Sequence, residues 1–485
     1  MLVEMQTDLT TTDRSALAAM FQARIMLPAL LIVAIVAGVA IEPLAALAAA
    51  GGIGFLVAYF YRRDWLVGGV FVALILQNLV YQRLLPVNPP LAALVKHADD
   101  FLTVFFIFAL AAETVFPTLR LSQVPLWRPA ALLLAICLLS AVHNHLTPRA
   151  VAIGTYVLLK NFIWFFLAAS IRLDDRGYRN VFRFLIVVLG GILAFGFVQF
   201  ATGDLTYNLL GLQADYRFGI VRLRSIFIRP VYLSEAMALL AVLAASAYIE
   251  FRRTVYLTLV LGALVAVALT MLVKTVMALG LAVGFLLLRK RPWLIVPYAV
   301  GAAVAMGSFA EYGTENVRFQ FATYLESPRS VRREGYRIGG EILRDSPLLG
   351  AGPGMFGGYA ATVLDSPIPA RYDFINYDNQ DYSSIDAFWP HLAGEVGLIG
   401  LVVFVWLLWS AGRASWQTST RATISPYART LAMTAGIFLL VASIEAFASA
   451  NFEDSFCGFM IFSMLGLTQG DSLPRGIGQA RENSS

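Results

Sequence analysis

The sequence predicts an all-α polytopic membrane protein with about 12 to 14 transmembrane helices and a long helical external loop between the late spans. Of the 485 residues, 59% are hydrophobic and only 14% are charged, whereas a soluble domain carries about 25% charged residues. The apolar residues fall in runs close to the roughly 20 residues that a spanning helix needs. Cys137 and Cys457 are too few for a disulfide scaffold, and we expect them to pack as small hydrophobes.

The candidate spans are the apolar runs of the chain. The first two are short and are separated by Glu42-Pro43, and the last is marginal in length, which leaves the count at about 12 to 14. The runs cover residues 25–41, 43–60, 65–82, 100–116, 125–143, 150–171, 181–201, 230–250, 254–273, 275–288, 292–310, 389–411, 429–449 and 455–469.

Basic residues predict the orientation of these spans. With residues 1–24 in the cytoplasm, alternation places nearly every short basic cluster on one side, which the positive-inside bias makes cytoplasmic. The N-terminal segment carries acidic residues before the first apolar run, unlike a cleaved signal. The expected organisation is a cytoplasmic segment 1–24, spans within 25–310, an external loop 311–388, spans within 389–469 and a cytoplasmic tail 470–485. The basic clusters include Arg62-Arg63, Arg172 with Arg176 and Arg179, Arg252-Arg253, Arg289-Lys290-Arg291, and Arg413 with Arg421.

Two of the external connections are long, at residues 202–229 and 311–388. A loop as long as the second is expected to have structure of its own. Residues 330–345 have amphipathic spacing and predict a helix that lies on the outer face. The side chains predicted to share one side of it are Tyr336, Ile338, Ile342 and Leu343.

The loop 202–229 is rich in arginine although it is predicted to be external. This placement runs against the positive-inside bias and therefore needs a reason. An arginine fork can bind phosphate oxygens through paired hydrogen bonds. A solvated loop that touches lipid headgroups is the simpler alternative. The residues concerned are Arg217, Arg222, Arg224 and Arg229.

Further charged residues lie at the predicted membrane boundary or within it. Lys160 falls in the middle of a span and should face a cavity or a partner. Lys274, between two runs, either extends to the interface or points into an outward-facing cavity. Arg332 lies in the long loop. Asp386 comes just before a helix start marked by Pro390, where a carboxylate can act as a general base or simply cap the helix.

Other signals point to no further chemistry. The glycines at 350, 352 and 354 lack the Gly-Lys-Ser/Thr of a phosphate-binding loop and predict a turn. His143 and His145 are two residues apart, with no further ligand nearby, so we expect no metal site. His391, inside a span, is expected to be packed or hydrogen-bonded. No basic run with interleaved aromatic residues suggests nucleic acid, and the net charge of +5 is attributed to topology.

Several of these stretches occur in an order that is typical of one family. They resemble motifs of the O-antigen ligase and polymerase superfamily, bacterial integral-membrane glycosyltransferases, over roughly residues 150–410. Ligases of this family have histidine where this chain has Asp386. The family has a Ser-Arg pair where this chain has Val273-Lys274-Thr275, so the cation is kept but the arginine is not. The matching stretches are Arg222–Phe227 with Pro230, Lys274, Arg332 with Tyr336, Ser346–Gly352, and Asp386 with Glu395–Gly400.

The resemblance implies a location in the bacterial inner membrane and a reaction on its periplasmic face. The donor would be an oligosaccharide on undecaprenyl diphosphate, and the acceptor a sugar hydroxyl of another glycan. Asp386 would act as the base, without metal or cofactor. The leaving diphosphate would be held by cations, for which Arg222 and Arg332 are the catalytic candidates and Arg224, Lys274, Arg217 and Lys160 the substrate-binding candidates.

Four functions stay open from the sequence. A polymerase of lipid-linked repeat units fits Asp386 best, and a ligase that transfers glycan to lipid A-core or another acceptor is the nearest alternative. A transporter or flippase of lipid-linked sugars belongs to another class, and so does a subunit that only docks partners. The expected partners are the lipid-linked donor, the glycan acceptor, membrane lipids and other polysaccharide-assembly proteins, and not nucleic acid.

Overall fold

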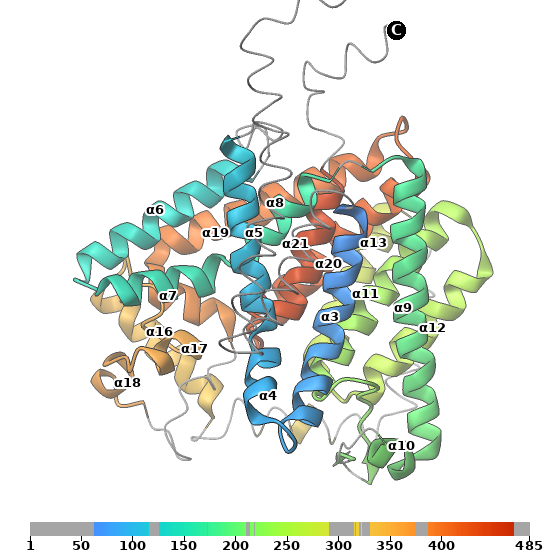
Figure 1. Cartoon of the computed structure of the whole chain (residues 1–485), viewed down its shortest axis with the longest axis horizontal. Coiled ribbons are helices and arrows are strands. Elements are labelled where there is room, and N and C mark those ends of the chain that lie inside the picture. Colours follow the sequence, from blue (N-terminus) through green and yellow to red (C-terminus); the bar gives the residue numbers. More distant parts are fainter. Residues whose placement is uncertain are drawn as a thin grey trace, which may run out of the picture.

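The computed structural model describes residues 63–115, 126–171, 173–209, 214–217, 219–290, 315, 317–319, 322, 330–374 and 387–469 (Figure 1). These residues form α-helices and one two-stranded antiparallel sheet. The predicted spans 25–41, 43–60 and 292–310 lie outside the described residues, as do both terminal segments and Asp386.

The helices follow the predicted apolar runs closely. The predicted span bounds agree with the observed ones to within about four residues for α3, α5, α6, α11, α12, α13, α20 and α21, whereas α9 begins earlier and α19 ends later than predicted. The elements are α3 Arg63–Leu84, α4 Pro89–Lys96, α5 Ala98–Val115, α6 Trp127–His143, α7 Pro148–Leu159, α8 Phe162–Ala169, α9 Asp175–Thr202, α10 Asp204–Leu209, β1 Tyr216–Arg217, β2 Ile220–Val221, α11 Pro230–Phe251, α12 Thr254–Leu269, α13 Val273–Lys290, α16 Val331–Asp345, α17 Gly358–Val363, α18 Ile368–Arg371, α19 Phe388–Thr420, α20 Pro426–Glu445 and α21 Ser455–Leu467.

Among the described helices, 4 are long and apolar enough to cross a membrane: α9, α11, α19 and α20. The total becomes 5 if α7 and α8, which meet at a 57° bend, form one broken span. Shorter apolar helices, including α6, α12 and α21, accompany them. The chain is therefore a helical, multi-pass membrane protein, and the larger predicted number of spans stays a prediction.

Helix α11 forms the centre of the bundle. Nearly every residue from Leu233 to Ala247 is buried, as expected for a helix that is apolar all round and surrounded by others. Helices α9, α12, α13 and α20 pack around it. The outer helices expose apolar side chains, such as Val187 of α9 and Trp409 of α19, which are 70% and 69% exposed. Such faces are suited to contact with lipid.

The predicted span 150–171 is not a single straight helix. It breaks at Lys160-Asn161, between α7 and α8. The Asn161 amide is buried and donates to the backbone carbonyls of Phe452 and Asp454, at 2.8 and 3.2 Å. Helix α8 then packs closely on α21. Because of the break, the polar side chains of Lys160 and Asn161 reach hydrogen-bonding partners that they would not reach from a straight apolar helix.

The long loop does contain short helices, as predicted. Helix α16 matches the predicted helix 330–345, and Ser330 caps it by accepting a hydrogen bond from the Arg333 amide at 3.3 Å. Ile338 and Ile342 are buried in a small second core with Ala150 of α7 and Ile368 of α18. Tyr336 is instead exposed, because it lies two residues from Ile338 and so points to the opposite side of the helix.

The connections that carry the candidate residues gather at one end of the bundle. Helices α9, α11, α12 and α13 run up and down, and α4, α10 and the β1–β2 hairpin lie at the lower end of Figure 1. The loop after α10 is joined to the end of α12, since the Leu223 amide donates to the Leu269 carbonyl at 3.0 Å. The predicted alternation therefore agrees with this arrangement, while the membrane face that this end occupies stays a prediction.

Candidate functional site

The arginines of the predicted loop 202–229 stand on an extended segment with alternating burial. After α10, a β-hairpin pairs Tyr216 with Val221 and Arg217 with Ile220. Leu223, Ser225 and Phe227 are then buried, so the intervening arginines face the other way. Ser225 fixes this register: its amide donates to Gln199 at 2.7 Å and its hydroxyl donates to the Ile192 carbonyl at 2.8 Å.

Arg217, Arg222 and Arg224 form what we call the arginine cluster. Arg222 and Arg224 both contact one carboxylate oxygen of Asp215, at 2.9 and 3.3 Å. Arg222 also donates from Nε to the Thr270 carbonyl at 3.2 Å. Burial lowers the pKa of Arg222, and the positive charge of the neighbouring Arg217 lowers it further. The Arg222 and Arg224 guanidinium groups thus share one oxygen of Asp215 with the charge of Arg217 close by, which suits an anionic ligand.

The two other cations of this cluster are held in different ways. The Arg217 guanidinium lies over the Phe319 ring, 5.0 Å from its centroid. Arg224 donates from Nη1 to the Ile228 carbonyl at 3.1 Å. Its buried Nε has no hydrogen-bond partner among the described residues. One donor of Arg224 therefore remains for a group that the described residues do not supply.

Lys274 begins α13, directly after the α12–α13 turn that contacts Arg222. Its side chain is half-buried, and its positive charge attracts the carboxylate of Glu235 in α11. The next residue, Thr275, is buried and donates a hydrogen bond to Glu445 of α20. Lys274 is thus placed among carboxylates as well as beside the arginine cluster.

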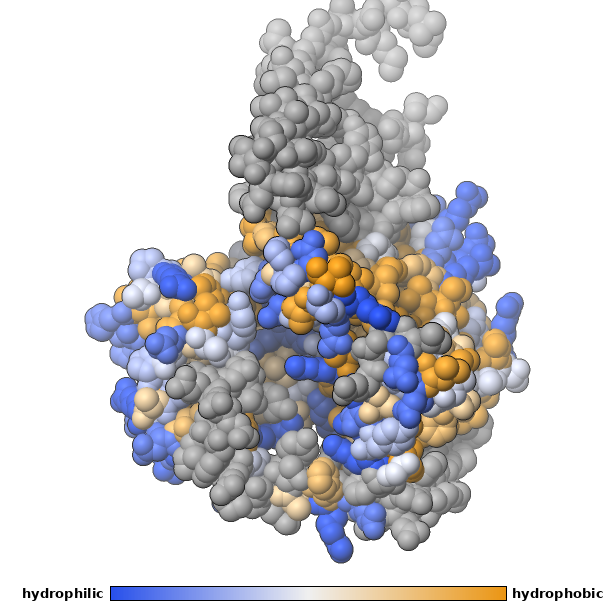
Figure 2. Space-filling model, turned by 60° about the horizontal axis from the view of Figure 1, so that its bottom comes forward, coloured by the Kyte–Doolittle hydropathy of each residue, from blue (hydrophilic) through white to orange (hydrophobic). Residues whose placement is uncertain are grey.

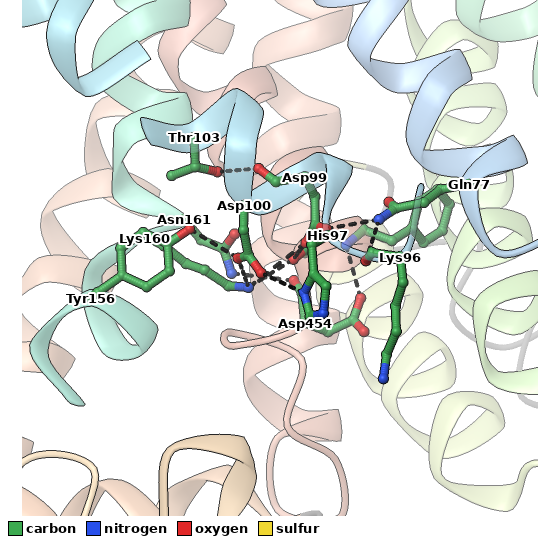
Figure 3. Close-up of polar contacts among 12 residues, drawn as sticks. Gln77, Lys96, His97, Asp99, Asp100, Thr103, Tyr156, Lys160, Asn161 and Asp454 are labelled. Carbon is green, nitrogen blue, oxygen red and sulfur yellow. Dashed lines mark hydrogen bonds and ion pairs between the residues drawn. The ribbon is translucent and has the colours of Figure 1, made fainter. Parts of the chain in front are cut away.

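Lys160 lies at the α7–α8 break in the polar group that we call the Lys160 cluster (Figure 3). Its Nζ lies 3.3 Å from Asp100 and 3.8 Å from Asp99 and donates to Ser455 at 2.9 Å. Ser455 in turn donates to Asp99. The prediction that Lys160 faces a cavity or a partner is resolved in favour of partners, and two carboxylates compensate its charge.

Further polar side chains complete the Lys160 cluster. Asp100 accepts a hydrogen bond from the Tyr156 hydroxyl at 2.9 Å and lies 3.6 Å from His97. Asp99 accepts from Gln77 at 2.8 Å. The residues come from α3, the α4–α5 junction, α7 and α21, so this cluster ties four segments together at the helix break (Figure 3).

Residues 446–454, the α20–α21 connection, contact the segments next to the remaining candidates, Arg332 and Asp386. Tyr336 of α16 donates to the Phe447 carbonyl at 2.7 Å, which places the helix of Arg332 beside this connection. The Phe388 amide, at the start of α19, donates to the carbonyls of Ala446 and Ser449. The chain just after Asp386 is therefore fixed here, although Asp386 itself lies outside the described residues.

The far end of the same connection faces the arginine loop. The Tyr232 ring packs on Phe456, two residues after Asp454, where the charges of Asp454 and Arg229 act on its hydroxyl. Asp454 is in turn influenced by Lys160. When this end of the molecule is turned forward, hydrophilic side chains gather in a hollow at its centre (Figure 2). The described contacts thus link the arginine loop, Lys274 and Lys160 around one end of the bundle, with Arg332 on α16 next to it.

The two most specific motif stretches pack directly on each other. Gly397 has a φ of 67° and kinks α19. The freed amides of Leu398 and Ile399 donate to the carbonyls of Pro347 and Leu348, at 2.9 and 3.3 Å. In return, the amides of Ala351 and Gly352 donate to the carbonyls of Gly394 and Glu395. The glycine turn thus replaces the hydrogen bonds that the kink removes from the helix.

A triad formed by His391, Glu395 and Glu453 lies next to this kink. His391 Nε2 is 3.0 Å from Glu395, and its Nδ1 is 2.9 Å from Glu453. The Phe356 amide donates to Glu395 at 3.1 Å. The expectation that His391 is packed and hydrogen-bonded is confirmed, and the triad joins α19 to the glycine turn and to the α20–α21 connection.

The sequence analysis did not identify most of the carboxylates that the structure places beside the candidate cations. Glu235 and Glu445 lie in apolar helices, where a charge is rare and functional by default, so this signal could have identified them. Asp99, Asp100 and Asp215 carried no comparable signal, because their partners are distant in sequence. Among the described residues, no group of three His, Cys, Asp or Glu side chains is arranged to hold a metal ion.

The chain was compared with known proteins. No family model matches it, and no curated protein matches its sequence. The resemblance to the O-antigen ligase and polymerase superfamily therefore stays a prediction from its motifs.

Proposed function

We propose that this protein is a glycosyltransferase that lengthens lipid-linked polysaccharide repeat units, with undecaprenyl diphosphate as the leaving group. The observation that carries the proposal is the arginine cluster, in which Arg222 and Arg224 share one oxygen of Asp215 and the charge of Arg217 lies close by. A diphosphate supplies further negative charge to the two arginines that share this oxygen. Preorganised cations stabilise the charge that develops on such a leaving group without reorganisation.

The proposed reaction is a direct displacement on the periplasmic face. The acceptor hydroxyl oxygen attacks the anomeric carbon of the donor sugar, and the bond from that carbon to the diphosphate oxygen breaks. The electron pair leaves with the lipid diphosphate, held by Arg222 and Arg224, and Arg332 and Lys274 are the further candidate cations. Asp386 takes the hydroxyl proton as the general base. Attack opposite to the leaving group inverts the anomeric centre.

The arrangement of connections at one end supports this assignment. The α20–α21 connection contacts α16, the helix of Arg332, and Phe388 at the start of α19, three residues before His391. Its far end, near Asp454, lies beside Tyr232 and the arginine loop. Apolar helices on the outside of the bundle suit a donor whose prenyl tail stays in the bilayer. Lys160 contributes less than the arginines, since Asp99 and Asp100 compensate its charge.

Purified protein supplied with lipid-linked repeat units tests the proposal by its products. Longer glycans on the lipid, formed equally well with a chelator present, are expected. Transfer of the glycan to lipid A-core instead would identify a ligase. Loss of activity on chelation would contradict the metal-independent mechanism.

A transporter of lipid-linked sugars is the second candidate, because transporters use broken helices and charges within the membrane. The α7–α8 break with Lys160 and the buried Glu235 and Glu445 favour it. Movement of a lipid-linked sugar across proteoliposome membranes, with no new glycosidic bond, would support the transporter and contradict the enzyme.

A further inference from the structure

The interior of the bundle contains carboxylates that the proposed reaction does not use. Glu235 lies in the second turn of the central helix α11 and is 2% exposed, and Glu445 at the end of α20 is 1% exposed. A charged carboxylate in such surroundings is stable only when a positive charge or hydrogen-bond donors compensate it.

Glu445 is well provided with hydrogen bonds. It accepts one from Thr275 and another from the Asn451 amide nitrogen, the latter at 3.0 Å. Glu235 is not: its buried Oε2 has no hydrogen-bond partner among the described residues. Helix α11 packs on α20, and it also contacts α21 beside the connection that holds Asn451, which places the two carboxylates in one buried site.

A second buried acceptor of this site also lacks a partner. Asn451 is fully buried, and its nitrogen is committed to Glu445, which leaves its Oδ1 without a donor in the described part of the chain. An amide oxygen does not take up a proton near neutral pH. Protonation of Glu235 would satisfy the carboxylate but not Asn451, whereas a cation can bind both oxygens.

Carboxylates outnumber cations around this site. The groups that face Glu235 are Asp454 and Cys457 of the α21 start, Glu445 of α20 and Lys274 of α13. Asp454 accepts hydrogen bonds from two backbone amides, and Lys160, whose charge also acts on it, is already paired with Asp99 and Asp100. Among the described groups that face Glu235, Lys274 is then the cation set against two glutamates, so negative charge is left uncompensated.

We propose that Glu235, Glu445 and Asn451 bind one alkali-metal cation of the Na⁺ class in the interior of the bundle. The ligands are hard oxygens, as such cations require. The cation would join α11 to α20 and to the α20–α21 connection. The proposal does not depend on glycosyl transfer, because no site residue of that reaction is a ligand.

Thermal unfolding of the purified full-length protein in detergent tests the cation site. Tm is measured in NaCl and in choline chloride at constant ionic strength and pH. We expect Tm to rise with Na⁺ concentration, since a ligand that binds only the folded state stabilises it. In Glu235→Gln the dependence on Na⁺ should disappear, and Tm in choline should equal or exceed that of the wild type, because the uncompensated charge is gone.

Two further variants separate this site from a general effect of salt. Glu250→Gln changes the same helix at its other end, where Glu250 pairs with Arg429, and should keep the full Na⁺ dependence. Asn451→Ser should weaken Na⁺ binding at least tenfold. The proposal is overturned if wild-type Tm is the same in both salts, if Glu235→Gln keeps the Na⁺ response, or if acidification alone stabilises the wild type while Na⁺ does not.

Discussion

At the residue scale, the candidate cations differ in how much negative charge lies against each of them. Lys160 lies against two carboxylates and a serine hydroxyl, whereas Arg222 and Arg224 share one oxygen of Asp215. The sequence identified these cations from their unusual positions. It did not identify their partners, because Asp99 and Asp100 come from a different helix and the contact exists only after α5, α7 and α21 have packed.

Lys160→Met should destabilise the protein. It would leave Asp99 and Asp100 without their cation in a site where the Lys160 and Asp99 side chains are 13% and 12% exposed, and removal of one partner of a buried pair costs about 3–5 kcal/mol. Arg371→Met is the control, because the Arg371–Asp345 pair is largely exposed and such pairs contribute only about 0–1 kcal/mol. Equal Tm values for the two variants would contradict a structural role for Lys160.

Asp386→Asn should abolish transfer while the protein still reaches the membrane at normal levels. The amide cannot accept the hydroxyl proton, and loss of a general base reduces the rate by about 100- to 10,000-fold. Asp365→Asn, an exposed substitution in the same long loop, should leave the rate unchanged. Full activity of Asp386→Asn would remove the base assignment.

At the element scale, the structure explains why two motif stretches occur together. The glycine turn was predicted as a turn, but its docking on α19 was not, because the kink at Gly397 has no local signal beyond the glycine itself. A side chain at Gly350 would meet the Gly394 carbonyl oxygen at 2.5 Å, and one at Gly397 would meet the Leu348 carbonyl carbon at 2.3 Å. Both glycines are therefore needed for the close approach of the two backbones.

Gly397→Ala should destabilise the protein. The backbone at this position has a positive φ, and a strained residue of this kind costs about 1–3 kcal/mol before the clash is counted. Gly412→Ala lies in the same helix, where the added methyl group would meet Leu439 at an ordinary 3.6 Å. Thermal unfolding should show a lower Tm for Gly397→Ala and an unchanged or higher Tm for Gly412→Ala. Similar Tm values would show that the kink is not required.

At the scale of the whole molecule, hydropathy predicted the helices well. The spans of α11, α13 and α21 were predicted with nearly the observed bounds, whereas α9 and α19 extend beyond their apolar runs into polar residues. Sequence could not show that α7 and α8 form a broken helix, since the break depends on contacts of Asn161 with residues 452–454. The sequence also did not predict the β-hairpin, which is too short to give a strand pattern. It did not show how Arg332 and the arginine cluster are placed relative to each other.

Cysteine labelling can test the predicted orientation. Cys137 and Cys457 are buried, so single cysteines at exposed positions can be followed with an impermeant maleimide in whole cells. Tyr359→Cys, in α17, should be labelled from outside, and Arg421→Cys, after α19, only once the inner membrane is permeabilised. The reverse pattern would place the long loop on the cytoplasmic face and exclude a periplasmic reaction.

The most direct test of the central claim is the rate of chain extension on lipid-linked repeat units by purified variants. Arg222→Ala and Arg332→Ala should lose transfer, for Arg222 by about 100- to 1,000-fold, the loss expected when one group that stabilises the leaving charge is removed. Arg252→Ala, which changes an exposed arginine after α11, should retain the wild-type rate. Undiminished extension by Arg222→Ala would contradict the claim that the arginine cluster stabilises a departing lipid diphosphate.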